Sequence, residues 1–359
     1  MAKFPSKLIS LSFFIVILAL TPRASAVTGG SQTTSSPPQC GSETARVCRN
    51  NAEALKLKII AIAAILVTSM IGVCLPMFSR AVPALQPDKD LFVLVKAFAS
   101  GVILATGYMH VLPDSFDCLR SDCLPEKPWK KFPFTTFVAM LSAVFTLMVD
   151  SYAMSYYRKL DLDIEVKRTS DANAIVDGKL ESQHCHGFNV AKADDNASQL
   201  LRYRVVAQVL ELGIVVHSVV IGLSLGASDN PCTIRPLVAA LCFHQLFEGM
   251  GLGGCILQAE YGMRMKSIMV FFFSATTPFG IALGIGLSNV YSDNSRTALI
   301  VVGLLNACSA GLLNYMALVD LLAADFMGPK LQNSMKLQTW GYTAVLLGAG
   351  GMALMAKWA

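Results

Sequence analysis

The chain has 359 residues, of which 54% are hydrophobic and 15% are charged, and its mean hydropathy is +0.53. Soluble domains average about a quarter charged residues, so this composition excludes an ordinary soluble protein and indicates an integral membrane protein. The net charge of +5 is small, and the basic residues lie between apolar runs rather than in one block. This pattern is typical of membrane loops and excludes a nucleic-acid-binding surface.

The first 26 residues have the pattern of a secretory signal peptide. Lys3 and Lys7 flank the start of the apolar stretch LISLSFFIVILAL, and the small residues ASA end at Ala26. We expect cleavage there rather than a retained helix, because the apolar run is short and is followed by small residues. Residues 27–55, rich in Ser, Thr, Gly and Pro, are expected to form an extracytosolic N-terminal segment.

Eight later segments are apolar and long enough to cross the ~30 Å hydrocarbon core of a bilayer. The predicted fold is therefore an all-α membrane protein with helices one to three within residues 56–156 and helices four to eight within residues 204–359. A cleaved signal peptide puts both ends of the mature chain outside, and the excess of basic residues in the loops assigned to the inside agrees. The approximate limits of the spans are 57–79, 91–112, 134–156, 205–226, 233–256, 267–289, 297–319 and 338–356.

Residues 157–203 form the longest predicted connection between membrane helices. This segment has balanced charge and few aromatic residues, so we expect a largely disordered cytosolic loop. Its tract SQHCHGF places His184 and His186 on either side of Cys185. The tract is either a weak metal-binding site or an incidental loop sequence.

The ten cysteines divide between compartments. Cys40, Cys48, Cys118 and Cys123 fall on the predicted outer side, where oxidation is expected. Four cysteines allow three different pairings into two disulfides, and the sequence does not select one of them.

Two histidines and a glutamate lie inside predicted membrane helices, where an ionisable group is costly unless it is paired or lines a polar path. His217 is nine residues from the outer end of the fourth helix, and His244 is eleven residues from the outer start of the fifth. These positions are ~14 Å and ~17 Å deep, so antiparallel neighbours bring both imidazoles close to the midplane. Glu248 is one turn beyond His244 on the same helix face.

This arrangement predicts a shared metal site. Two neutral imidazoles and a carboxylate suit divalent zinc, iron, cobalt or manganese. Ser218 and Gln245, beside the two histidines, can add oxygen ligands or hydrogen bonds. Small residues recur on both helices and allow close helix approach in lipid. The alternative for each histidine alone is a structural residue that is hydrogen-bonded to a neighbouring backbone group.

His110 and Asp114, near the outer end of the second helix, can collect cations at an entrance. They are four residues apart, but we expect Pro113 to end the helix between them. A surface pair with no role is the alternative.

A second polar layer is predicted on the cytosolic side of the metal site. Asp150 and Glu211 lie at the depth of Lys96 and Glu248, ~22–24 Å from the outer face. They can form an exit in which Lys96 neutralises a carboxylate until a cation arrives. The alternative is a structural cluster of ion pairs or side chains that extend to the interface.

The stretches HSVVIGLSLGAS, from His217, and HQLFEGMGLGG, from His244, resemble the signature helices of the ZIP family, the zinc- and iron-regulated transporter-like proteins. ASGVILATGYMHVLPDSF in the second span and SATTPFGIALG in the sixth agree, and plant members are the most similar. The resemblance implies a bundle of eight helices that takes divalent metal into the cytosol, with His217, His244 and Glu248 as ligands. Ile221 and Thr277 stand where two-metal members have acids, so one ion per site is expected.

The expected function is transport of zinc into the cytosol, with iron, manganese or cadmium as further cargo. The alternatives are ferrous iron as the main cargo and a membrane metal sensor that does not transport. An intramembrane metalloenzyme is disfavoured because HQLFE supplies one histidine where H-E-x-x-H supplies two. The metal is therefore a substrate, and no prosthetic group is expected. The partners are metal ions, the lipid bilayer (most simply the plasma membrane) and a second copy in a homodimer.

Overall fold

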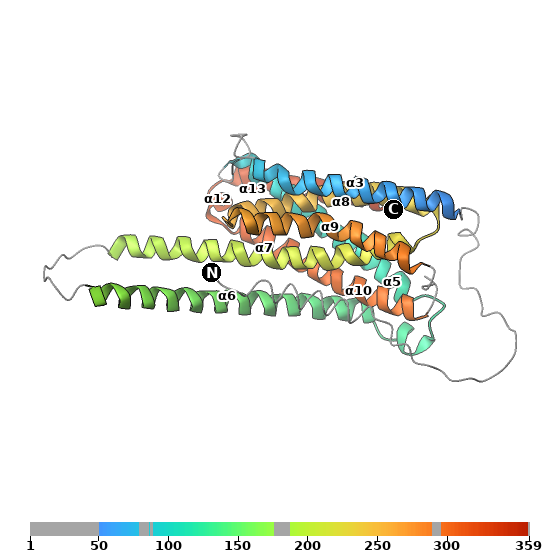
Figure 1. The fold of residues 1–359 in the computed structure, drawn as a ribbon, viewed down its shortest axis with the longest axis horizontal. Coiled ribbons are helices and arrows are strands. Elements are labelled where there is room, and N and C mark those ends of the chain that lie inside the picture. The colour runs from blue at the N-terminus through green and yellow to red at the C-terminus, as the bar shows by residue number, and fades with distance from the viewer. Residues whose placement is uncertain (1–49, 79–85, 87–88, 176–186, 289–295, 358–359) are drawn as a thin grey trace.

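The computed structural model describes residues 50–78, 86, 89–175, 187–288 and 296–357 (Figure 1). This part of the chain is helical almost throughout and contains no strand. The predicted signal peptide lies outside the described residues. Seven helices in the described ranges are long and apolar enough to cross a membrane, judged by length and composition: 51–77, 90–119, 134–159, 199–227, 231–258, 263–287 and 296–326.

Adjacent helices alternate in direction along the chain. We call the end of the bundle that holds Asn51, Leu119 and Ala227 the outer end, and the end that holds Asp90 and Gln258 the inner end, following the predicted orientation. The elements are α3 (Asn51–Met77), α4 (Asp90–Thr106), η3 (Gly107–Val111), α5 (Leu112–Leu119), η4 (Glu126–Lys130), α6 (Phe134–Ile175), α7 (Gly187–Ala227), α8 (Pro231–Gln258), α9 (Met263–Leu287), α10 (Arg296–Tyr315), η5 (Met316–Ala323), α11 (Ala324–Phe326), α12 (Pro329–Gln332) and α13 (Met335–Ala356).

Polar side chains define where two of the membrane helices begin. The side chain of Asn50 accepts a hydrogen bond from the backbone N–H of Glu53 at 3.2 Å, and Asn230 accepts one from Cys232 at 3.0 Å. Both asparagines are N-caps, which satisfy backbone donors that have no partner within the helix. Pro231 follows Asn230 as the first residue of α8, where its missing N–H costs nothing.

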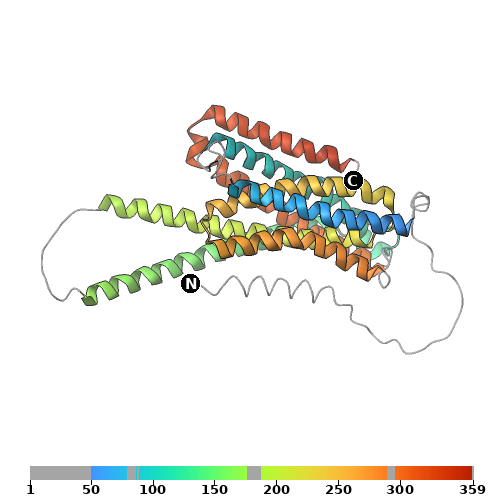
Figure 2. The same ribbon diagram turned by 45° about the horizontal axis from the view of Figure 1, so that its top comes forward.

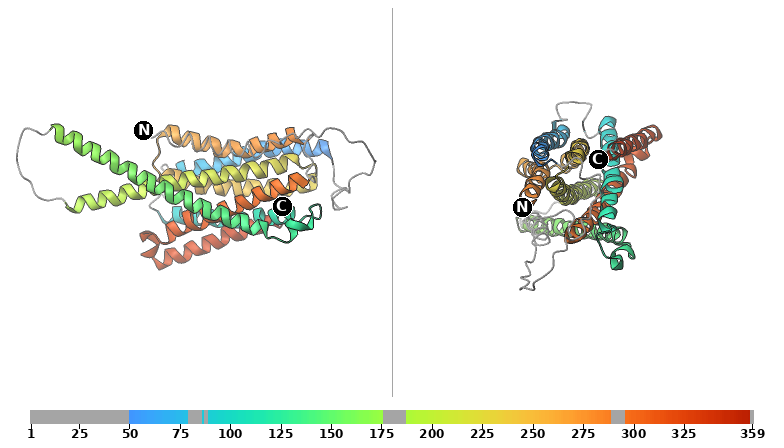
Figure 3. Two further views of the ribbon diagram at one scale, coloured as in Figure 1. Left: turned by 90° about the horizontal axis from the view of Figure 1, so that it is seen from below. Right: turned by 90° about the vertical axis from the view of Figure 1, so that its right-hand side faces the viewer.

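The long helices pack as two groups, which the end-on view of Figure 3 separates. The first group contains α3, α7, α8 and α9. The second contains α4 with its continuation through η3 and α5, α6, α10 with its continuation through η5 and α11, and α13. In Figure 2, α13 lies along α4 at the edge of the bundle. The two groups meet where α7 and α8 face α4, α6 and α10.

Glycines bring the backbones into contact within the first group. A Cβ atom added to Gly222 on α7 would lie 2.7 Å from the carbonyl oxygen of Thr277 on α9. One added to Gly249 on α8 would lie 2.8 Å from the backbone nitrogen of Val73 on α3. These contacts are the close helix approach that the repeated small residues predict.

Contacts between the two groups are made by side chains instead. A Cβ atom on Gly251 of α8 would meet the Ile103 side chain at 3.4 Å, and one on Gly254 would meet the Phe92 ring at 3.4 Å. Both distances are ordinary van der Waals separations. Each group is therefore joined internally by backbone contacts, whereas the surface between the groups consists of side chains that can rearrange.

The second span is longer than predicted because Pro113 does not end it. The chain passes from α4 through the π-helical η3 into α5, and the N–H of Leu112 bonds to the carbonyl of Gly107, five residues earlier. The wider π turn places Pro113 in the first turn of α5, where no backbone donor is required of it. The prediction that this proline separates His110 from Asp114 is wrong.

The predicted disorder of residues 157–203 is also wrong for the part that the structure describes. α6 continues to Ile175, and α7 begins at Gly187. Figure 1 shows both helices extending past the inner end of the other helices. RKLDLDIEVKR contains Arg, Lys, Leu and Glu, which have good helix propensity, and no Gly or Pro, so nothing in this stretch ends the helix. His184 and His186 lie outside the described residues.

The cysteine prediction needs one correction. Cys123 and Cys232 each take part in a disulfide bond, whereas Cys118 is a free thiol. Cys118 lies on α5 and faces α10, since a Cβ atom on Gly303 would meet its Cβ at 3.0 Å. Its side chain is therefore directed into the helix packing, and Cys232, in the first turn of α8, takes its place among the oxidised residues.

Candidate metal site

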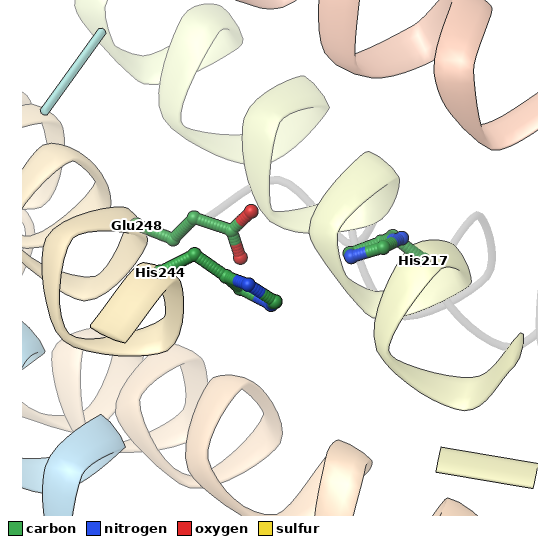
Figure 4. Close-up of side chains that lie close together, drawn as sticks. All are labelled: His217, His244 and Glu248. Atoms are coloured by element: carbon green, nitrogen blue, oxygen red, sulfur yellow. The ribbon is translucent and has the colours of Figure 1, made fainter. Parts of the chain in front are cut away.

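His217, His244 and Glu248 converge at one place inside the bundle. One ligand atom from each lies within 4.8 Å of the others, and the side chains point toward one another from α7 and α8 (Figure 4). The two imidazole ring centroids are 5.8 Å apart. The depths counted along the two helices therefore correctly predict that these side chains lie close together.

The separation of the three side chains is close to that required by one ion. Zinc binds nitrogen and oxygen ligands at ~2.0–2.2 Å, so two ligands of one ion are at most ~4.2–4.4 Å apart. Small side-chain rotations would bring atoms within 4.8 Å of one another into that range. The geometry is that of a site that can close on a single dication.

The polar atoms of these three residues have no hydrogen-bond partner within the described protein. Both nitrogens of His217 and of His244 and both oxygens of Glu248 are buried and unpartnered. The three residues are at most 1% exposed. An unpartnered buried polar group costs ~1–3 kcal/mol, and more for a charged group, so six such atoms in one place indicate a ligand. This observation disfavours the alternative of a structural histidine bonded to the backbone for His217. His244 interacts with the backbone of Ala240, but not with the geometry of a hydrogen bond.

Ser218 and Gln245 lie beside the histidines, as predicted. Both are 1% exposed, and the Ser218 hydroxyl and the Gln245 amide nitrogen also have no partner. These neutral groups can hydrogen-bond to a ligand atom or to water carried by the ion.

His110 lies deeper than the predicted entrance. Its ring centroid is 6.2 Å from that of His244, and the side chain is 6% exposed, with Nε2 unpartnered. The π-helical turn of η3 positions it, since this turn shifts the residues that follow relative to a regular α-helix. The second helix group therefore contributes a third imidazole near the two that belong to the first.

Asp114 lies one turn beyond His110 toward the outer end and is partly buried. Because the helix is continuous between them, both side chains can lie along the same face, in contrast to a helix interrupted at Pro113. Asp114 thus adds a partly buried carboxyl group on the outer side of His110, and Asp117 follows it on the same helix.

The predicted role of Lys96 is wrong. Its ammonium group does not neutralise Asp150, Glu211 or Glu248 but donates to Asp325 Oδ1 and to Gln258 Oε1, each at 3.0 Å. Asp325 lies in α11, beyond the position where the sequence predicts the seventh span to end. The π-helical η5 lengthens this span to residue 326 and brings the carboxylate to Lys96.

The predicted exit residues lie on the inner side of the site but do not form one cluster. Glu211 on α7 is 5% exposed and interacts electrostatically with Tyr261. Asp150 on α6 accepts a hydrogen bond from the Tyr315 hydroxyl at 3.3 Å. Asp150 and Glu211 are therefore attached to different neighbours in the two helix groups.

Asp320 was missed by the sequence analysis. It lies in η5, is 3% exposed and has an unpartnered Oδ2, and it interacts electrostatically with Asp150. The available signal was an aspartate within the apolar stretch MALVDLLA, one residue beyond the predicted limit of the span. Asp320 and Asp150 together give the inner side of the second group two neighbouring carboxyl groups.

Ile221 and Thr277, which stand where two-metal members have acids, are packed within the first group. Ile221 is 5% exposed and belongs to an apolar cluster with Ile65 and Ile281. Thr277 is fully buried and has an unpartnered hydroxyl. Neither position supplies a carboxylate for a second metal ion.

Comparison with known proteins gives a consistent result. The family model described as ZIP Zinc transporter matches residues 55–356. The chain is 59% identical over 368 residues to Fe(2+) transport protein 2 of Oryza sativa subsp. japonica, which covers 96% of each chain. It is 58% identical to Fe(2+) transport protein 1 of Arabidopsis thaliana, over 98% of this chain and 97% of the relative. It is 59% identical to zinc transporter 7 of Arabidopsis thaliana, over 87% and 88%.

The family match covers nearly all of the described bundle, including both helices that hold the triad and η3, which holds His110. The similar relatives are full-length matches that are named as transporters, not enzymes. These findings confirm the resemblance seen in the two histidine-containing stretches. The chain is a multi-pass membrane protein that belongs to the ZIP zinc transporter family.

Proposed function

We propose that this protein moves Zn²⁺ into the cytosol, one ion at a time, through the site formed by His217, His244 and Glu248. The observation that supports this proposal most strongly is the set of six unpartnered ligand atoms buried at the centre of the bundle. With one carboxylate and two imidazoles, the empty site has one formal negative charge. Such a site binds a dication firmly enough to select it but still releases it, as transport requires.

The second helix group completes the route on both sides of the triad. His110 adds a neutral imidazole near His244, and Asp114 follows toward the outer end. Asp320 and Asp150 provide carboxylates toward the inner end, with Glu211 on α7. The ion would therefore pass between the two groups, in contact with ligands from each.

The orientation and the number of crossings are part of the proposal. α13 has 22 residues, enough to cross the ~30 Å hydrocarbon core, and packs along α4. With α13 as the eighth crossing, both ends of the mature chain lie outside. The plasma membrane is the expected location, because a secretory signal peptide precedes the bundle.

Alanine or amide variants of the triad test the site. His217→Ala, His244→Ala and Glu248→Gln are expected to lower uptake of radioactive zinc to the level of cells without the protein, because each removes a metal ligand. Uptake is divided by the amount of protein at the cell surface, so that loss of folding is separated from loss of transport. Ser142→Ala, in the α6–α10 contact of the second group, is the matched control and is expected to keep its uptake. Normal uptake by the triad variants would exclude the site.

Ferrous iron is a second candidate cargo, because relatives with nearly the same identity are named for iron and for zinc. Two imidazoles and a carboxylate accept either metal. Uptake of radioactive zinc in the presence of excess Fe²⁺, Mn²⁺ or Cd²⁺, and the reciprocal experiment with radioactive iron, ranks the cargoes. Stronger inhibition of iron uptake by zinc than of zinc uptake by iron supports zinc. Binding without accumulation of either metal would indicate a sensor.

A further inference from the structure

Four ion pairs each lie within one of the two helix groups. In the first group, Lys58 pairs with Asp229 at 3.8 Å, and Arg235 pairs with Glu53. In the second, Lys330 pairs with Asp90 at 3.7 Å, and Lys96 pairs with Asp325 at 3.0 Å. These four pairs stabilise the groups separately. Across the boundary, Arg202 of α7 has a longer-range electrostatic attraction to Asp150 and Asp320 of the second group.

Lys96 also forms a hydrogen bond that joins the second group to the first. Its Nζ donates to Oε1 of Gln258, the last residue of α8, at 3.0 Å. Lys96 is 4% exposed, so its ammonium group needs both partners. The charge is balanced by Asp325 on its own side, and the partner across the boundary is a neutral amide.

The kind of contact between the groups determines the free energy needed to separate them. Pulling apart a buried ion pair leaves an uncompensated charge and is strongly unfavourable. Separating Lys96 from Gln258 leaves the Lys96–Asp325 pair intact and exposes an amide that water can solvate. The contact is strong enough to hold the inner ends together, but it can be broken without separating opposite charges.

A second crossing contact has the same chemistry. The Tyr157 hydroxyl on α6 donates to Oε1 of Gln208 on α7 at 3.3 Å. Again the acceptor is a glutamine of the first group, and again the contact lies toward the inner end. Both donors belong to the second group.

The packing around Lys96 is incomplete. A cavity of about 20 Å³ is lined by Leu75 and Pro76 of α3, Met250 and Gly254 of α8, and Phe92, Val95 and Lys96 of α4. It therefore lies on the boundary between the two groups, beside Lys96. Gln258 follows Glu248 by ten residues on the same helix, ~15 Å along its axis toward the inner end.

We propose that Lys96 and Gln258, supported by Tyr157 and Gln208, form an inner-end latch that holds the two helix groups together and opens when the ion is released to the cytosol. The latch rests on the proposed function, since the inner end is cytosolic only in the proposed orientation. It assigns roles to four residues that do not touch the metal.

Two substitutions of Gln258 change the latch in opposite directions. Gln258→Glu places a carboxylate opposite Lys96 and strengthens the contact across the boundary, whereas Gln258→Leu keeps the bulk and removes the acceptor. Tyr157→Phe weakens the second contact from the other group. Gln338→Glu and Gln338→Leu make the same chemical changes near the start of α13 and are the matched controls.

The free thiol of Cys255 reports the state of the latch without any transport. It lies one helical turn before Gln258 and is 2% exposed, so the closed inner end protects it from alkylation. In metal-free membranes, we expect N-ethylmaleimide to alkylate Cys255 about tenfold faster in the Gln258→Leu variant than in the wild-type protein. This factor corresponds to ~1.4 kcal/mol. Tyr157→Phe shifts the rate in the same direction by a smaller factor, and Gln258→Glu slows it. Mass spectrometry of the Cys255 peptide gives the rates, with Cys242 as the internal reference.

Zinc uptake provides the second measurement. Gln258→Glu is expected to lower the maximal rate about tenfold at unchanged KM, because the latch opens more rarely while the metal site is intact. The latch is refuted if both Gln258 variants shift Cys255 alkylation in the same direction, or if neither differs from its Gln338 control. If Gln258→Leu does not reach the membrane, an unchanged alkylation rate in Tyr157→Phe refutes it instead. The alkylation measurement stands even if the metal site is placed wrongly, which uptake by the triad variants tests separately.

Discussion

The buried polar side chains of the two helix groups serve different purposes. Along the contacts of α10 in the second group, the hydroxyls of Ser142 and Ser115 each donate to a backbone carbonyl at 2.7 Å, that of Cys308 and that of Gly303. In the first group, the polar atoms of His217, His244 and Glu248 have no partner. The two hydroxyls with partners join helices to each other, whereas the proposed metal ligands leave their polar atoms free to bind an ion.

The second group repeats this distinction within itself. Its unpartnered groups include His110 and Asp320, and these two lie in the π-helical segments η3 and η5. π-helical turns are often found at functional sites because they shift a side chain out of the regular helical register. The unpartnered imidazole and carboxyl group of the second group thus lie in π-helical turns, whereas the unpartnered Ser309 and Asn314 lie in the regular helix α10.

The largest expected effect is a loss of stability when the helix packing of the first group is disrupted. Gly284→Ala on α9 would place a methyl group 2.5 Å from the carbonyl oxygen of Leu223 on α7, so the helices must move apart. We expect a loss of ~3 kcal/mol in the free energy of unfolding, the upper part of the range for overpacking. Thermal unfolding in detergent measures it. Gly286→Ala, two residues further on the same helix, meets nothing within 4 Å and should unfold at or above the wild-type temperature.

The second prediction tests whether His110 belongs to the metal site or only packs beside it. His110→Ala removes the imidazole whose ring is 6.2 Å from that of His244. We expect the KM for zinc uptake to rise about tenfold, as is typical for groups that support metal ligands, with unfolding unchanged. An unchanged KM would make His110 a packing residue despite its unpartnered nitrogen.

The smallest expected effect is the loss of stability when a hydroxyl that has a hydrogen-bond partner is removed. Ser142→Ala removes the hydrogen bond to the Cys308 carbonyl, and we expect a loss of ~1 kcal/mol in the free energy of unfolding. The KM for zinc should not change, because Ser142 joins α6 to α10 and does not contact the ion. A higher KM, measured in the uptake assay, would contradict the division between the two kinds of polar residue.

Helix periodicity and depth counting correctly predicted that His217, His244 and Glu248 converge. His217 and His244 are each a known number of residues from a helix end, and an α-helix rises by a constant 1.5 Å per residue, so their depths follow from the sequence. Glu248 shares a face with His244 for the same geometrical reason. These inferences need only regular helices and antiparallel neighbours.

The remaining errors arise where the helices are not regular. The π turns at Gly107–Val111 and Met316–Ala323 lengthen two spans and move His110, Asp320 and Asp325 relative to a count at constant rise. Hydropathy does not detect a π turn, because the apolar residues continue through it. The partner of Lys96 was therefore sought among the wrong carboxylates.

The unbroken length of α7 has a consequence for control of the protein. From Gly187 to His217 the helix has no interruption, a distance of ~45 Å at 1.5 Å per residue. A force applied at the Gly187 end of this rod is transmitted along the helix axis to the backbone of His217. In the proposed transporter, a partner bound at that end would therefore act on the metal site without touching its ligands.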